Sequence, residues 1–174
     1  MMRDAIRLAP IGRRAALACL LATPARAQAG LAAPAGPVLL SVTGRVSRPN
    51  RGAQADFDRA MLEALPSHSL STATNWTSGV RRFEGPLVRD ALAQAGAQGE
   101  RAMAVALNDY AIEIPMTDFE EYDVILALRM DGQALTVRNK GPIWLVYPRD
   151  EHPEIRNSMY DSRWIWQLRT LQVR

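Results

Sequence analysis

The residues that most often carry chemistry are sparse in this chain and form no familiar catalytic motif. His68 falls on a predicted strand and His152 in a loop, and neither belongs to a pair with metal-binding spacing. Because a zinc site needs three or four protein ligands, these histidines favour structural roles. The sequence has no G-x-S-x-G turn, no G-x-G-x-x-G loop and no P-loop. Motifs therefore give no support to a serine hydrolase, a dinucleotide-dependent enzyme or a kinase.

Four clusters of polar, aromatic and Gly-Pro residues stand out instead. They are TATNWT at 72–77 with FEGPL at 83–87, ALNDY at 106–110 running into Ile114-Pro115, NKGPIWLVYP at 139–148, and SRWIWQL at 162–168. The candidate ligand contacts in them are Thr72, Thr74, Trp76, Asn108, Asp109, Tyr110, Lys140 and Trp144.

Each candidate also has an ordinary structural explanation. Tryptophans dominate buried area in any core, and threonines are common in strands. Asn108 and Asp109 are typical turn residues. Lys140 and Arg138 fit a solvated hairpin edge, but a cation beside a Gly-Pro pair can also hold a phosphate group. Both interpretations remain open at this point.

The four clusters, in this order, resemble the molybdopterin-binding domain of the sulfite oxidase and periplasmic methionine-sulfoxide reductase type. The resemblance is greatest to small exported members made of that domain alone, and it covers Val38 to Arg174. It implies a single α+β domain with a mixed sheet, an oxidoreductase ancestry and molybdopterin as the expected cofactor.

The resemblance also shows where this chain departs from catalytic members. In those members a cysteine on a strand before the tryptophan segment binds molybdenum, and Thr72 best matches that position. A thiolate is a soft anionic ligand, whereas a threonine hydroxyl is neutral and a poor replacement. Catalytic members also tend to carry an arginine after the Gly-Pro of the third cluster, where this chain has Trp144 and Lys140 is the nearest cation. We therefore expect no metal site.

The N-terminus has the pattern of a secretory signal. Four arginines before residue 15 precede the apolar run AALACLLA, and small residues follow at Ala25, Ala27 and Ala29. This order predicts a signal over 1–27, a flexible leader over 28–37 and the folded domain over 38–174. Arg13-Arg14 is a weak match to a twin-arginine signal. The only cysteine, Cys19, lies inside the predicted signal.

Removing the predicted signal changes the charge of the chain. Residues 1–27 hold five of the 21 basic and one of the 18 acidic residues, which leaves 16 basic and 17 acidic residues, net −1. The basic character therefore belongs largely to the signal and does not indicate nucleic-acid binding. No run after the signal is long enough to cross a bilayer as a helix. We expect a periplasmic protein whose partner is a small molecule or another periplasmic or membrane protein.

Short strands and helices alternate without a βαβ rhythm, which favours the α+β class. Strands are predicted over 38–46, 67–76, 103–107, 111–114, 143–147, 163–168 and 171–173. A helix capped by Asp56 is ended by Pro66, a second covers 87–95 with Gly96 at its C-cap, and a helical turn over 117–121 is capped by Thr117 or Asp118. Asp131-Gly132 predicts a hairpin between 124–130 and 134–138.

Three functions are compatible with these observations. The first is a cofactor-free or altered-ligand binding, sensing or accessory module. The second is a molybdopterin-dependent oxidoreductase with a non-thiolate metal site. In the third, the clusters serve only the fold, and the protein acts through interactions with a partner.

Overall fold

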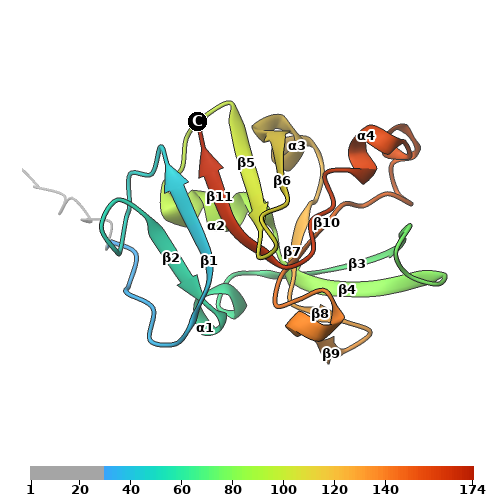
Figure 1. Cartoon of the computed structure of the whole chain (residues 1–174), viewed down its shortest axis with the longest axis horizontal. Helices are drawn as coiled ribbons and strands as arrows, with labels where there is room; N and C mark the ends of the chain where they lie inside the picture. The colour runs from blue at the N-terminus through green and yellow to red at the C-terminus, as the bar shows by residue number, and fades with distance from the viewer. Residues whose placement is uncertain (1–29) are drawn as a thin grey trace, which may run out of the picture.

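The computed structural model describes residues 30–174, and its largest element is a five-stranded sheet. The order is β2-β1-β11-β5-β6, formed by β1 (Val38–Gly44), β2 (Ala55–Asp58), β5 (Arg101–Ala106), β6 (Ala111–Pro115) and β11 (Leu168–Val173). The pairing of β1 with β11 is parallel, and the other three pairings are antiparallel. Figure 1 shows β11 running through the middle of this sheet beside β1.

Two smaller sheets lie beside the first. Their strands are β3 (Ser67–Ala73), β4 (Val80–Pro86), β8 (Arg129–Met130) and β9 (Gln133–Ala134) in one, and β7 (Ile125–Ala127) with β10 (Trp144–Val146) in the other. The β3–β4 hairpin is long and extends away from the five-stranded sheet (Figure 1). At Gly85 an added Cβ would lie 2.0 Å from the carbonyl oxygen of Leu126, so this position needs glycine for β4 to lie against β7.

The helices are short. They are α1 (Arg59–Glu63), α2 (Val88–Ala95), α3 (Met116–Glu121), α4 (Ser158–Asp161) and the 3-10 turns η1 (Val137–Asn139) and η2 (Pro153–Ile155). The apolar face of α2 is buried, and Gly96 ends the helix in the left-handed conformation, as the sequence predicts. None of the helices over residues 30–174 is long and apolar enough to cross a membrane.

The α+β class with a single mixed-sheet domain is confirmed, and so are the helix before Gly96 and the hairpin turn at Asp131-Gly132. The arms of that hairpin are only the two-residue strands β8 and β9, and the predicted strand over 134–138 runs into the 3-10 turn η1. One buried apolar cluster runs through all three sheets and α2. Residues 30–37 contact this domain, because the backbone amides of Ala35 and Gly36 donate to Asp58 and the amide of Asn50 donates to Ala32. The predicted signal over 1–27 lies outside the described residues.

Three local predictions were wrong. Asp56 does not cap a helix: it lies fully buried in β2, and Asp58 caps α1 by accepting from the Met61 amide. The alternation of apolar and polar residues continues through this region, so the pattern could not show which aspartate ends the strand. Residues 163–167 form no strand; instead Trp164 and Ile165 are buried in an irregular segment that leads into β11.

The third correction concerns α3. Neither Thr117 nor Asp118 caps it, because the N-cap position is Pro115 and no side chain accepts a bond there. Asp118 is buried and accepts from the Tyr147 hydroxyl at 2.8 Å and from Arg163 Nη1 at 2.6 Å. Asp118 therefore takes part in a long-range polar contact and does not act as the N-cap that its place in the sequence predicted.

Candidate functional site: a tryptophan-lined pocket

All four tryptophans of the chain meet in one place. Trp76 lies 5.9 Å from Trp164 and 5.4 Å from Trp166, measured between ring centroids. Trp144 lies 6.4 Å from both Trp164 and Trp166, and Phe83 packs on its other side at 5.2 Å. These spacings and the mostly tilted or edge-on angles are those of favourable aromatic pairs. The cluster joins segments nearly 90 residues apart in sequence.

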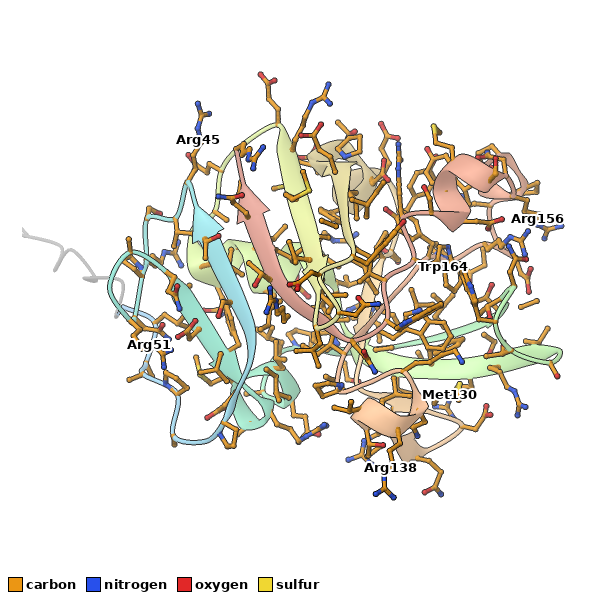
Figure 2. The ribbon with its side chains drawn as sticks, in the orientation of Figure 1. Arg45, Arg51, Met130, Arg138, Arg156 and Trp164 are labelled. Atoms are coloured by element: carbon orange, nitrogen blue, oxygen red, sulfur yellow. The ribbon has the colours of Figure 1, made fainter. Side chains whose placement is uncertain are left out.

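A pocket of about 240 Å³ opens on this cluster. Its lining comes from three segments: Trp76 in the β3–β4 turn, the β5–β6 turn, and the end of α4 with the segment after it. The lining residues are Trp76, Ala106, Asn108, Tyr110, Asp161, Ser162, Trp164 and Trp166. Figure 2 shows Trp164 between the long β3–β4 hairpin and the α4 segment.

Hydrogen bonds hold these three segments together. Asn75 Nδ2 donates to Asp161 Oδ2 at 2.7 Å, which joins the hairpin turn to α4. The Tyr110 hydroxyl donates to the Ser162 carbonyl at 3.0 Å, which joins the β5–β6 turn to the same segment. Asn108 Oδ1 accepts from the Tyr110 backbone amide at 3.2 Å. The pocket is therefore a built feature of the fold, with aromatic walls and a polar rim.

The structure brings three of the eight predicted contacts to the pocket, namely Trp76, Asn108 and Tyr110. Asp109 lies outside it, in a left-handed turn conformation with φ of 64°, and pairs with Arg169 at 2.7 Å on the surface. Trp144 is fully buried, and its indole Nε1 has no hydrogen-bond partner among residues 30–174.

The two threonines lie in and just beyond β3. Thr72 is fully buried, and its hydroxyl donates to the adjacent Ala73 carbonyl at 3.3 Å. Thr74 is buried too, where its hydroxyl shares a 2.8 Å hydrogen bond with Thr77 and accepts from the Trp76 amide. Thr74 thus shapes the turn that carries Trp76.

Lys140 is the chain's only lysine, against 20 arginines. Its ammonium lies 5.8 Å from the Trp144 ring centroid and 5.7 Å from that of Trp166. No carboxylate within residues 30–174 forms an ion pair with it. Its backbone adopts a left-handed conformation directly after η1.

Asp161 is the residue that sequence reasoning missed. It precedes the fourth cluster by one position and is the only acidic residue in the pocket lining. The feature of the sequence that could have pointed to Asp161 is its place directly before Ser162-Arg163-Trp164. Trp164 and Trp166 belong to that cluster, but nothing in the sequence showed that they would meet Trp76.

A buried polar network supports the far side of Trp164. Tyr147 stacks on that tryptophan at 6.4 Å and donates to Asp118, whose side chain is 6% exposed. Burial, with the Asp118 charge beside it, raises the pKa of the Tyr147 hydroxyl. Arg163 completes the network by pairing with Asp118 and lying 4.6 Å above the Tyr160 ring.

With this geometry, comparison with known proteins identifies the family. Residues 39–151 match the model of the oxidoreductase molybdopterin binding domain, and the chain belongs to that family. A similar solved structure is the sulfane dehydrogenase SoxCD from Paracoccus pantotrophus, at 19% identity and a TM-score of 0.56. The match covers 77% of this chain but 37% of that one, so this chain spans well under half of its length. A search of curated proteins found no match.

Residues 30–174 contain no cysteine that could supply a thiolate, but they form a pocket with aromatic walls. Within residues 30–174 no group of three or more histidine, cysteine, aspartate or glutamate side chains could hold a metal. At the position where the family resemblance predicts a thiolate, Thr72 has a neutral hydroxyl. The pocket, in contrast, offers aromatic faces and a few polar groups, which suit a flat ring system. A neutral threonine hydroxyl is a poor ligand for molybdenum, whereas the aromatic walls of the pocket suit a planar ring.

Proposed function

We propose that this protein is an exported binding module that uses a molybdopterin-type fold to hold a planar small molecule without a metal. The observation that carries the proposal is the convergence of Trp76, Trp164 and Trp166 on one pocket. Aromatic faces bind flat heterocycles by stacking, and each such contact contributes about 1–3 kcal/mol. The N-terminal sequence supports export to the periplasm.

The size of the pocket supports a small ligand. At about 240 Å³ it lies below the roughly 300–1,000 Å³ typical of sites for drug-sized molecules. A two-ring heterocycle such as a pterin matches this space better than the whole cofactor. A periplasmic or membrane partner would recognise the ligand-bound form of the protein, which gives the module its sensing or accessory role.

A second candidate is a molybdopterin-dependent oxidoreductase with a non-thiolate metal site. Family membership favours it, and the absence of a cysteine from residues 30–174 opposes it. Metal and pterin analysis of the protein purified from a molybdenum-replete host separates the two. Stoichiometric molybdenum would replace our proposal with this one, whereas bound pterin without molybdenum would support the binding module.

The proposal is tested by calorimetric titration of the purified protein with pterin, nucleotides and small inorganic anions. We expect pterin to bind and Trp76→Ala to weaken binding by about 10-fold or more, because one stacking face is lost. Val80→Ala is the matched control, since Val80 lies in the same hairpin, is exposed and does not line the pocket. Failure of every ligand to bind, or equal effects of the two variants, would refute the proposal.

A further inference from the structure

We propose that Trp76, Trp164 and Tyr147 form a relay that carries a one-electron oxidation from the pocket to a buried tyrosine, whose proton passes to Asp118. This activity goes beyond ligand binding, because it belongs to the side chains of the protein itself. It arises from the placement of the aromatic residues. All four tryptophans and three of the four tyrosines form one contiguous set of ring contacts, and the fourth tyrosine, Tyr110, lines the pocket.

The residue types of the relay suit this chemistry. Tryptophan and tyrosine are the aromatic side chains that lose an electron most readily, and residues 30–174 contain no cysteine that would compete with them. Trp76 and Trp164 line the pocket, so an oxidant held there contacts both. Tyr147 is fully buried and does not line the pocket. It is therefore oxidised through a neighbouring ring and not by direct contact.

The three rings of the relay follow one another in contact. The ring centroids of Trp76 and Trp164 are 5.9 Å apart, and those of Trp164 and Tyr147 are 6.4 Å apart with an angle of 29° between the planes. Separations of this size are those of aromatic rings packed directly against each other. Each electron transfer therefore crosses a single ring contact.

Two cations set the relay apart from the other aromatic rings. The Lys140 ammonium lies 5.8 Å from the Trp144 ring centroid and 5.7 Å from that of Trp166, and the Arg163 guanidinium lies 4.6 Å from that of Tyr160. A nearby cation opposes the removal of an electron, because the oxidised ring becomes positive. These three rings are therefore harder to oxidise than the members of the relay.

The proton of Tyr147 has an acceptor in place. A tyrosine that loses an electron also loses its hydroxyl proton, and this hydroxyl donates to Asp118 Oδ2 at 2.8 Å. The electron passes from Tyr147 to the Trp164 radical cation as the proton moves to the Asp118 carboxylate. The products are neutral Trp164, a neutral Tyr147 radical and protonated Asp118. The oxidant, a planar one-electron acceptor in the pocket, keeps the electron that the tryptophans gave up.

The test is flash photolysis of the purified protein with ruthenium tris-bipyridine and an electron-accepting quencher. This pair generates a one-electron oxidant in solution, so no bound ligand is needed. Transient absorption follows the tryptophan and tyrosine radicals at separate wavelengths. We expect the tryptophan radical to decay as a delayed tyrosine radical appears. Its appearance should be slower in D₂O, because the proton moves together with the electron.

Variants identify the tyrosine and the path. Tyr147→Phe should abolish the delayed tyrosine radical and prolong the tryptophan radical. Trp164→Phe should abolish it as well, because Trp76 is then cut off from Tyr147. Tyr160→Phe and Tyr110→Phe are the matched controls, since each removes one other hydroxyl and should leave the delayed signal. Direct oxidation of the exposed Tyr110 gives a prompt signal instead.

A delayed tyrosine radical of wild-type size in Tyr147→Phe would overturn the inference, and so would its loss in Tyr110→Phe. If Tyr147→Phe does not fold, the wild-type protein decides. A tryptophan radical that decays without a delayed tyrosine radical, or with the same rate in D₂O, would then overturn the inference. None of these measurements involves a ligand, so their failure leaves the proposed function standing.

Discussion

The buried contact between Asp118, Tyr147 and Arg163 gives a quantitative test of the structure. Asp118 and Arg163 are 6% and 12% exposed, and their 2.6 Å ion pair is reinforced by the Tyr147 hydroxyl at 2.8 Å. Asp118→Asn keeps the shape and an acceptor for Tyr147 but removes the negative charge. Arg163 then remains almost buried without a counterion.

Removing one partner of a buried ion pair costs about 3–5 kcal/mol. Because asparagine retains one hydrogen bond, we expect Asp118→Asn to lower the free energy of unfolding by about 3 kcal/mol. At about 2–4 °C per kcal/mol for a domain of this size, the melting temperature should fall by roughly 6–12 °C. Tyr147→Phe removes only the hydroxyl, and should cost about 1.5–3 kcal/mol.

The assay is urea unfolding followed by circular dichroism, with thermal melting as a second measurement. Asp109→Asn is the control, since it breaks a 2.7 Å ion pair to Arg169 at the surface, where Asp109 is 81% exposed. An exposed pair contributes at most about 1 kcal/mol. If Asp118→Asn is no more destabilising than Asp109→Asn, the buried network does not stabilise the fold as described.

Three further predictions concern other parts of the molecule. Backbone amides, that of Met61 first, lower the pKa of the Asp58 carboxyl. Its stabilisation is therefore fully present above the ordinary pKa of about 3.9 and is lost as pH falls through the lowered pKa. Asp58→Asn should accordingly lose its stability deficit as pH falls below about 4 in urea titrations. Gly85→Ala places a methyl group against the Leu126 carbonyl and should cost about 1–3 kcal/mol in the same assay. After reductive ¹³C-methylation, Lys140 should give one side-chain NMR signal shifted upfield by the ring currents of its tryptophan neighbours.

Each of these has a result that would contradict it. A constant difference between wild type and Asp58→Asn at all pH values would show that the carboxyl has no lowered pKa. An unchanged midpoint for Gly85→Ala would show that β4 and β7 are farther apart than described. A Lys140 signal at the position of free methylated lysine, unaffected by Trp166→Phe, would place the ammonium away from the rings.

Local features of the fold were predictable where a residue type strongly prefers one structural position. Gly96 at a helix end and Asp131-Gly132 at a hairpin are of this kind, and the structure has both. Asp56 and Asp118 were misassigned because an aspartate before an apolar run also suits a buried contact. The choice is made by partners distant in sequence, such as Tyr147.

The composition of the pocket was harder to predict than the strands. Asn108 and Tyr110 were among the predicted ligand contacts, but their proximity to Trp76 depends on how the hairpin and the sheet pack. Residues 163–167 alternate like a strand, yet Trp164 and Trp166 both contact Trp76. An alternation with a period of two residues predicts which side chains are buried and which are exposed. It does not predict which other segments of the chain cover the buried ones.

The parallel pairing of β1 with β11 has a consequence for the order of folding. These strands begin and end the described domain, and β11 separates the β1–β2 pair from the β5–β6 pair in the sheet. During synthesis the two halves of the sheet can form but cannot join until β11 leaves the ribosome. Contacts of such long sequence separation form slowly. A chain in which β11 has not yet paired would therefore stay in an open, protease-sensitive state.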